Sequence, residues 1–206
     1  YLERTQGGAI QTMKNYYNLE FQRRKQEHME NKKAIAAAAA GLVRDGDTLF
    51  INSGTTTYFA AVELKQRKNL NVVTNSISVA VELGGLPTFR VILLGGDISA
   101  QYSFTYGEDV KEQISRYRAN WAILSVDGIQ PGAGITTYHA EESVIDRIMM
   151  ERAQTPIIVA DSSKLGRESF SRISALTAQT ILITDQNANP DITAQIRADG
   201  VDVRII

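Results

Sequence analysis

The chain has 206 residues, and its 22 lysines and arginines nearly balance its 23 aspartates and glutamates, which leaves a formal net charge of −1 at pH 7. This balance argues against a free-standing nucleic-acid-binding domain, because such domains usually carry a basic face or stripe. The absence of cysteine excludes disulfides and thiolate chemistry, and with only two histidines and no HExxH motif we expect no metal site and no cofactor.

The first 29 residues differ from the rest of the chain. They are polar, charged and aromatic without a regular period, and we interpret residues 1–29 as a lead-in or an arm that packs on a neighbouring molecule. No apolar run approaches the about 18 residues of a membrane span, and the start of the chain has no signal-peptide core. These features favour a cytoplasmic protein.

From residue 30 onward the pattern is regular, with short apolar runs that alternate with helical repeats. Asn31 is a candidate N-cap of the first helix, and Gly46 is a candidate stop. The expected helices cover residues 31–46, 55–67, 76–85, 107–117, 140–154 and 189–200. The expected strands cover residues 47–52, 70–75, 89–96, 119–128, 155–161, 179–185 and 201–206.

The expected strands read as nearly continuous apolar runs, which is typical of a parallel sheet that is covered on both faces. Their alternation with helices indicates βαβ units. We therefore predict one three-layer α/β domain over residues 30–206, with a mostly parallel sheet of about seven strands and helices on both faces. A small subdomain could be inserted within residues 84–120, where the pattern is least regular.

Polar and small residues follow the apolar runs, at the expected carboxyl ends of the strands. In chain order these groups are Asn52 to Thr57, Thr74 to Ser76, Gly95 to Asp97, Ser125 to Gly128, Asp161 to Lys164, and Thr184 with Asp185. Each group alone can be explained as a helix cap or a turn, and Lys164 as a solvated lysine. However, ligands of open parallel sheets bind at the carboxyl ends of the strands, so the set together favours a common binding site.

A phosphate group fits this edge of the expected sheet. The helix that opens at Thr55 would offer free backbone N–H groups and the positive end of its dipole. Gly54 would allow ligand oxygens to approach the backbone, and Lys164 would supply a point charge. Aspartate and asparagine side chains suit sugar hydroxyls. Because the GxxxxGK[ST] and GxGxxG motifs are absent, we expect a small sugar or polyol with one phosphate rather than a nucleotide.

The same edge leaves a catalytic alternative open, in which general acid and base groups isomerise a sugar phosphate. The candidate groups are Asp127, Glu141, Glu142, Asp161 and Lys164. His139 precedes an expected helix, where a capping or surface role is more common than that of a base. No nucleophile elbow is present. Binding without turnover requires fewer special residues, and nothing in the sequence demands turnover.

A series of distinct motifs, each present once, covers nearly the whole chain from about residue 4 to the C-terminus. The motifs are RTQGGAI, ENKKAIAAAAAGLVRDGDTLFINSGTTT, NLNVVTNS, VILLGGD, SVDGI, GITT, ADSSKLG and LITD. This ordered set resembles the effector-binding half of DeoR-type transcription regulators, also called GlpR-type regulators. The resemblance implies a fold similar to ribose-5-phosphate isomerases and CoA-transferases, without catalysis, and a sensor of a phosphorylated sugar or polyol.

The resemblance also implies roles for individual residues. It places the phosphate on Ser53, Gly54, Thr55, Thr56 and Thr57, with Lys164, Arg24 and Lys32 as cationic partners. It places the sugar or polyol near Thr74, Asn75, Gly96, Gly107, Asp127, Gly128, Asp161 and Glu142. Asn52 and Ser53 stand where the family commonly has a more acidic pair, so the hydroxyl contacts here can differ from those of the family.

Members of this family carry a winged helix-turn-helix of about 60 residues before the sensor, and we expect one to precede this chain in the full-length protein. The expected function is that of a repressor of a carbohydrate catabolic operon, which binds operator DNA through that domain as a homodimer or homotetramer. Tyr16, Tyr17 and Phe21 are candidate interface residues. The alternative is a sugar-phosphate isomerase or aminosugar-phosphate deaminase of the same fold.

Overall fold

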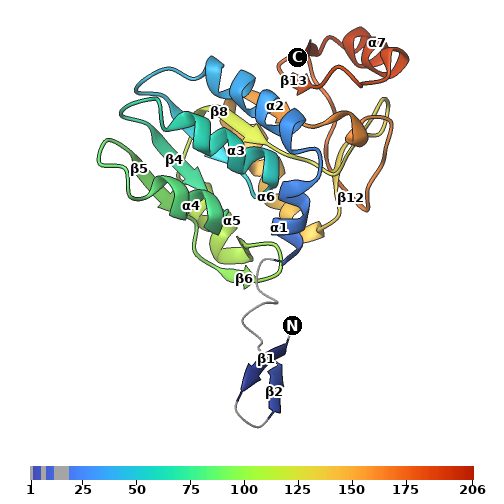
Figure 1. The fold of residues 1–206 in the computed structure, drawn as a ribbon. Coiled ribbons are helices and arrows are strands. Elements are labelled where there is room, and N and C mark those ends of the chain that lie inside the picture. The colour runs from blue at the N-terminus through green and yellow to red at the C-terminus, as the bar shows by residue number, and fades with distance from the viewer. Residues whose placement is uncertain (1, 6–7, 12–18) are drawn as a thin grey trace.

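The fold is known from a computed structural model, which describes residues 2–5, 8–11 and 19–206 (Figure 1). The candidate interface residues Tyr16 and Tyr17 lie outside the described residues. Near the N-terminus, strands β1 (Leu2–Thr5) and β2 (Gly8–Gln11) pair as an antiparallel hairpin. No helix in the described part of the chain is long and apolar enough to cross a membrane.

A seven-stranded sheet forms the centre of the domain, and all of its neighbouring strands are parallel. Across the sheet, the strand order is β14-β13-β11-β8-β3-β4-β5. In chain order the strands are β3 (Thr48–Ile51), β4 (Asn71–Thr74), β5 (Arg90–Leu93), β8 (Ala119–Leu124), β11 (Ala153–Val159), β13 (Ile181–Thr184) and β14 (Asp202–Ile205). This sheet confirms the predicted fold class.

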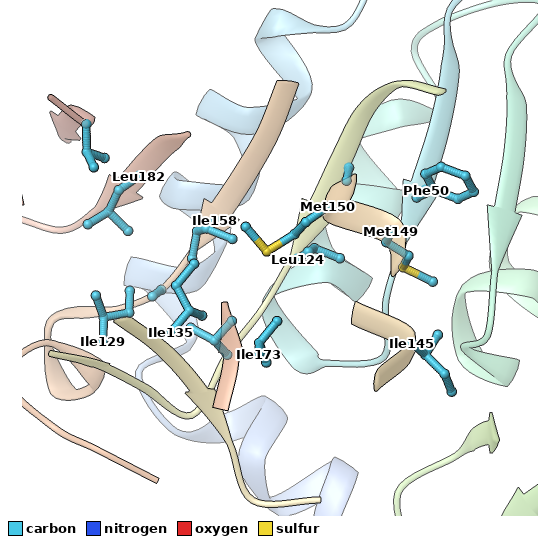
Figure 2. Close-up of a cluster of buried hydrophobic side chains, with 14 of the residues drawn as sticks. Phe50, Leu124, Ile129, Ile135, Ile145, Met149, Met150, Ile158, Ile173 and Leu182 are labelled. Atoms are coloured by element: carbon cyan, nitrogen blue, oxygen red, sulfur yellow. The ribbon is translucent and has the colours of Figure 1, made fainter. Parts of the chain in front are cut away.

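Helices cover both faces of the sheet and enclose two apolar cores (Figure 1). One face is covered by α2 (Met29–Leu42), α3 (Thr55–Leu64) and α4 (Ile77–Leu83), and the other by α5 (Glu108–Ile114), α6 (Ala140–Arg152) and α7 (Pro190–Ala198). Successive strand residues point to opposite faces, so Leu49 and Ile51 enter the first core while Phe50 enters the second. Figure 2 shows part of the second core, with Phe50 from β3 near Met149 from α6.

Two small antiparallel sheets lie beside the main sheet. One pairs β6 (Asp97–Ser99) with β7 (Phe104–Tyr106), within the range where the sequence allowed a subdomain. The other joins β9 (Gly128–Gln130), β10 (Gly134–Thr137) and β12 (Ser171–Ser174). The sequence pattern did not predict these strands, because runs of three or four residues are too short to show a clear period.

The beginning of the domain differs from the prediction. Helix α2 starts at Met29, so Asn31 lies inside the helix and is not its N-cap. The same helix ends at Leu42, before Gly46, which instead takes a positive φ of 87° in the following turn. Part of the expected irregular lead-in is a helix, α1 (Leu19–Gln26), and it packs against α3.

The connections of the sheet change direction between two neighbouring strands. From β3 the chain proceeds outward through β4 to β5, and it then crosses back to β8, which lies on the other side of β3. From β8 it proceeds in the opposite direction, through β11 and β13 to β14. Such a switch point leaves a crevice beyond the carboxyl ends of the two central strands, where ligands of open α/β sheets bind.

Candidate functional site

The carboxyl ends of β3 and β8 are joined at the switch point by the side chain of Asn52. Its amide nitrogen donates to the main-chain oxygen of Ser125 at 2.9 Å, and its amide oxygen accepts from the Ser125 N–H at 2.9 Å. Asn52 is fully buried, so this pair of hydrogen bonds fixes the two strand ends relative to each other. The loops that follow, which carry Ser53 and Gly54 on one side and Asp127 on the other, therefore start from a rigid base.

Glycine is required at position 54 because no side chain fits there, and not because of the backbone conformation. Its φ of 171° is extended, and any residue can adopt it. A Cβ atom at this position would lie 1.8 Å from the hydroxyl oxygen of Ser125. We predicted that ligand oxygens approach the backbone at Gly54. On the side where a Cβ would stand, the space is filled by Ser125.

We expect Gly54→Ala to lower the free energy of unfolding by about 1–3 kcal/mol, the usual cost of overpacking. The variant Gly54→Ala with Ser125→Gly should recover most of this loss, because the clashing side chain is removed. Gly41→Ala is the matched control, since nothing lies within 4 Å of a Cβ there and alanine is favoured in a helix. Urea unfolding measures all three, and an unaffected Gly54→Ala variant would contradict the packing argument.

The first turn of α3 points free donors into the crevice. Gly54 is the N-cap residue, and no side chain caps the helix, so the capping role that we considered for Ser53 or Thr55 is not found. The first N–H groups of a helix have no intrahelical acceptor. The Thr57 hydroxyl is turned inward and donates to main-chain oxygens of Asn52 and Gly54, both at 3.0 Å. The N–H groups at Thr55 and Thr56 therefore remain the donors for an anion.

Three adjoining hollows surround this helix start, and Arg24 of α1 lines all of them. The inner cavity, beside Ser53, Asp127 and Glu142, has a volume of about 20 Å³, which is enough for about one water molecule. The anion cavity is larger, with a volume of about 170 Å³. Among the residues that line it are His28, Lys32, Thr55, Thr56, Asp161, Lys164 and Arg167. The outer cleft opens between α1, Tyr138 and His139.

Two of the four lysine and arginine side chains of the anion cavity have no partner in the part of the chain that the structure describes. Arg24 forms an ion pair with Asp127 at 3.2 Å, and the Lys32 ammonium donates to the main-chain oxygen of Arg24 at 2.5 Å. Lys164 and Arg167 have no ion pair and no side-chain hydrogen bond within the described residues. Burial lowers the pKa of Lys32, and the nearby positive charges of Arg24 and Lys164 lower it further, against the opposing effect of Asp161. The cavity therefore has a surplus of positive charge.

Three carboxyl groups lie behind the inner cavity in different protonation states. Burial works to raise the pKa of Asp127, but Arg24, the Tyr138 N–H, Lys164 and Thr137 outweigh it and hold that pKa below its ordinary value. Burial and the neighbouring Asp127 raise the pKa of Glu142 to about 8. Asp127 is thus ionised at neutral pH, whereas Glu142 is protonated.

The Thr137 hydroxyl links these two groups, because its oxygen lies 3.1 Å from a carboxyl oxygen of Asp127 and 3.1 Å from one of Glu142. The single hydroxyl proton of Thr137 cannot bond to both carboxyl groups. The geometry fits a protonated Glu142 whose O–H donates to the Thr137 oxygen, while the Thr137 O–H donates to Asp127. Behind them, burial and Glu142 raise the pKa of Asp146 well above its ordinary value. Asp146 accepts from the Asn52 amide at 3.0 Å, and its other oxygen has no partner. No metal-binding group of acidic or histidine side chains occurs among the described residues.

The structure brings together ten of the residues predicted for the site. All of them line the inner cavity, the anion cavity or both: Arg24, Lys32, Ser53, Gly54, Thr55, Thr56, Asp127, Glu142, Asp161 and Lys164. Asp161 has an additional structural role, since its carboxylate accepts from the Ser163 N–H at 3.0 Å and begins the short 3₁₀ helix Ser162–Lys164. That turn positions Lys164 at the cavity.

Three of the predicted polar residues bond to the protein instead and lie outside the linings of these cavities. Besides Thr57, they include Thr74, whose hydroxyl donates to the main-chain oxygen of Ile51 at 2.6 Å. The amide nitrogen of Asn75 donates to the main-chain oxygen of Thr105 at 3.3 Å. At the polar end of β4, Thr74 therefore ties β4 to β3 and Asn75 ties it to the β6–β7 hairpin, and neither residue reaches the cavities.

The glycines predicted near the sugar also serve local packing. A Cβ on Gly96 would lie 2.4 Å from the main-chain oxygen of Tyr106, and one on Gly128 would lie 2.6 Å from that of Arg167. Gly107 precedes α5 with a positive φ of 107°. None of the three lines the inner cavity, the anion cavity or the outer cleft.

Other residues of the site were not singled out from the sequence. Arg167 reaches the anion cavity because the preceding loop is tied to β9, where the Gly166 N–H donates to the main-chain oxygen of Ile129 at 2.8 Å. Tyr102 packs edge-on against His139, with ring centroids 4.2 Å apart, and both line the inner cavity. These positions depend on the small antiparallel sheets, so no local sequence signal reveals them.

Comparison with known proteins gives one family and several relatives. The family described as "DeoR C terminal sensor domain" matches residues 27–186. The HTH-type transcriptional repressor GlcR of Bacillus subtilis (strain 168) is 33% identical over 98% of this chain and 78% of its own length. The glycerol-3-phosphate regulon repressor of Escherichia coli (strain K12) is 32% identical over 79% of this chain and 64% of its own length. Among solved structures, ribose 5 phosphate isomerase A from Neisseria gonorrhoeae aligns with a TM-score of 0.49 and 18% identity, over 70% of this chain and 55% of that one.

Proposed function

This chain belongs to the DeoR C-terminal sensor domain family, and we propose that it binds one phosphorylated sugar or polyol, without turnover, as the effector of a transcription regulator. Relatives that match most of the chain are named as transcriptional repressors, and one of them as the repressor of a glycerol-3-phosphate regulon. These names support a regulatory function connected with small phosphorylated carbon compounds.

The observation that carries the proposal is a pair of cations beside the start of α3 that have no partner among residues 2–5, 8–11 and 19–206. A phosphate monoester has a charge of about −1.5 to −2 at pH 7, and Lys164 with Arg167 supplies two positive charges that no carboxylate neutralises by direct contact. The N–H groups at Thr55 and Thr56 add hydrogen-bond donors and the positive end of the helix dipole. This charge balance supports one phosphate rather than two.

The rest of the ligand would extend from the anion cavity into the outer cleft. Asp127 lines that cleft and offers carboxylate oxygens, which accept hydrogen bonds from sugar hydroxyls. The cleft also contains the aromatic side chains of Tyr102, Tyr138 and His139, against which the C–H face of a sugar can pack. A polar edge beside aromatic faces supports a sugar or polyol.

Regulation would follow from different ligand affinities of two states of the full-length protein, since a ligand shifts an equilibrium only through such a difference. We propose that a winged helix-turn-helix before this domain binds operator DNA and that the regulator acts in the cytoplasm. We further propose a homodimer or homotetramer, because two-fold operators mirror the symmetry of the proteins that bind them.

The second candidate function is a sugar-phosphate isomerase or aminosugar-phosphate deaminase. It is favoured by the hydrogen-bonded chain of protonated Glu142, Thr137 and ionised Asp127, which resembles an acid–base pair. However, the inner cavity that Glu142 lines has a volume of about 20 Å³, which is too small for the reacting carbons of a substrate. Binding without turnover is therefore the better supported function.

A thermal-shift screen over phosphorylated sugars and polyols tests the proposal, with each unphosphorylated compound as its control. A ligand at 100 times its dissociation constant adds about 2.7 kcal/mol to the free energy of unfolding, which raises the Tm of a domain of this size by about 5–10 °C. At least one phosphorylated compound should produce such a shift, and its unphosphorylated counterpart should not. Steady conversion of a ligand by the purified chain would instead establish the enzyme.

A further inference from the structure

Helix α1 forms one wall of the site. Phe21 and Arg24 line the inner cavity, Arg24 and Glu27 line the anion cavity, and Glu20, Arg23 and Arg24 line the outer cleft. Figure 1 shows α1 below the ends of α2 and α3. It is the first helix in chain order among the described residues. Any change in the position of α1 therefore changes the shape of the site.

Among residues 20–26 of α1, apolar packing against the domain is made by one buried side chain. Of residues 20–26, only Phe21 is buried, and its ring meets the ring of Tyr58 on α3 edge to face, with centroids 5.7 Å apart. The Lys25 ammonium also lies over the Tyr58 ring, 4.1 Å from its centroid. With Phe21 as the one buried side chain of residues 20–26, the polar contacts of this segment also help to set its position.

The polar contacts that tie α1 to the site are made by cations of the anion cavity. The Arg24 side chain pairs with Asp127 at 3.2 Å through one terminal nitrogen, Nη2. The Lys32 ammonium of α2 donates to the main-chain oxygen of Arg24 at 2.5 Å. Arg24 has two further nitrogens and Lys32 two further protons, so both can bind an anion without releasing these contacts.

A residue in the left-handed conformation separates α1 from α2. His28, between the end of α1 and the start of α2, takes a left-handed conformation with a φ of 51° and a ψ of 34°. A non-glycine residue in this conformation interrupts the helical path, so that α1 and α2 are two helices instead of one. The two helices are therefore positioned by separate contacts, α1 by α3, and α2 by α3 and the sheet.

We infer that α1 is a strap that an anion in the site locks onto the domain. The inference rests on the proposed function, because the anion is the phosphate group of the effector. A phosphate at the α3 start, bound by Lys164 and Arg167, would also accept from the free nitrogens of Arg24 and from Lys32. It would then bridge α1 to the sheet edge and add a charged cross-link to the contact of Phe21 with α3. Occupancy of the site thereby sets the position of α1.

Hydrogen exchange of the α1 amides tests the strap, with inorganic phosphate as the probe and residues 190–198 of α7 as the internal reference. Phosphate at a concentration that saturates the thermal shift should slow exchange of the hydrogen-bonded amides of α1 by about tenfold or more relative to α7. Trypsin provides a second readout, because it cleaves after Arg23, Arg24 and Lys25. Cleavage at these three bonds should slow to a similar extent.

Arg24→Gln and Arg23→Gln form a matched pair of variants. Arg23 carries the same charge on the same helix, but it is exposed and pairs with Glu20 and Glu27. It lines the outer cleft and neither the inner cavity nor the anion cavity, where inorganic phosphate would bind. In Arg24→Gln, phosphate should still raise the Tm through Lys164 and Arg167, while the protection of α1 is lost; Arg23→Gln should keep both. If phosphate raises the Tm of the unmodified chain and α1 exchange does not change, the strap is wrong and the anion site stands. If neither inorganic phosphate nor any phosphorylated compound of the screen raises the Tm, the proposed function fails and the strap fails with it.

Discussion

Replacing Lys164 with alanine is expected to weaken the binding of the phosphorylated effector by well over tenfold while the fold remains intact. Lys164 lies at the anion cavity and has no partner within the described residues, so its removal breaks no bond of the protein. A hydrogen bond to a charged group contributes about 1.5–3 kcal/mol, and each 1.4 kcal/mol corresponds to a factor of about ten in affinity. Calorimetric titration measures the loss directly.

Lys33→Ala is the matched control for this variant. Lys33 follows Lys32 on α2, but its ammonium pairs with Glu30 at the surface and lines neither the anion cavity nor the inner cavity. Its removal changes the net charge of the chain by the same amount, so it should leave the affinity within about twofold. Equal affinities of Lys164→Ala and the unmodified chain would show that the phosphate binds elsewhere.

The free energy of unfolding is expected to fall as the pH rises from about 5 to about 8. The pKa of Glu142 is raised from its ordinary value of 4.5 to about 8 in the folded chain, first by burial and then by Asp127. In this window the unfolded chain has released a proton that the folded chain still holds, so each pH unit destabilises the fold by up to about 1.4 kcal/mol. The raised pKa of Asp146 acts in the same direction. Asp127 has a lowered pKa and loses its contribution only at more acidic pH.

Glu142→Gln should flatten this pH dependence, because glutamine imitates the protonated acid in shape and cannot ionise. Its Tm should exceed that of the unmodified chain most clearly near pH 8, by about 2–4 °C for each kcal/mol. The neighbouring Glu141 is exposed on the same helix, so Glu141→Gln should retain the slope of the unmodified chain. Thermal unfolding of the three proteins between pH 5 and about 8.5 measures how the Tm of each depends on pH. A stability that is constant across this range would mean that Glu142 is not buried in its protonated form.

The main sheet could be predicted because of the way its strands are buried. In β8 and β11, runs such as Ala122-Ile123-Leu124 and Ile157-Ile158-Val159 lie between two helical layers, so both faces require apolar side chains. A strand of this kind is visible in the sequence as a continuous apolar run. The strand ends then indicated which residues approach the crevice, and Gly54, Asp127 and Lys164 do lie there.

The strand order limited what could be predicted of the site. Strand β4 is next to β3 but lies away from the switch point, so Thr74 bonds to the end of β3 and Asn75 to the β6–β7 hairpin, and neither lines the cavities. The composition of a strand end does not show whether the strand lies at the switch point or away from it. Arg167 and α1 escaped prediction for a related reason, since their positions depend on the contacts of Gly166 with β9 and of Phe21 with α3.

The central claim is that this domain recognises the phosphate group of a sugar or polyol at the start of α3. The most direct measurement is a pair of calorimetric titrations, with the phosphorylated compound that raises the Tm most and with the same compound lacking its phosphate. We predict one binding site for the phosphorylated compound and an affinity at least about tenfold lower for its counterpart, from the loss of charged hydrogen bonds. Equal affinities for the two compounds would contradict the claim.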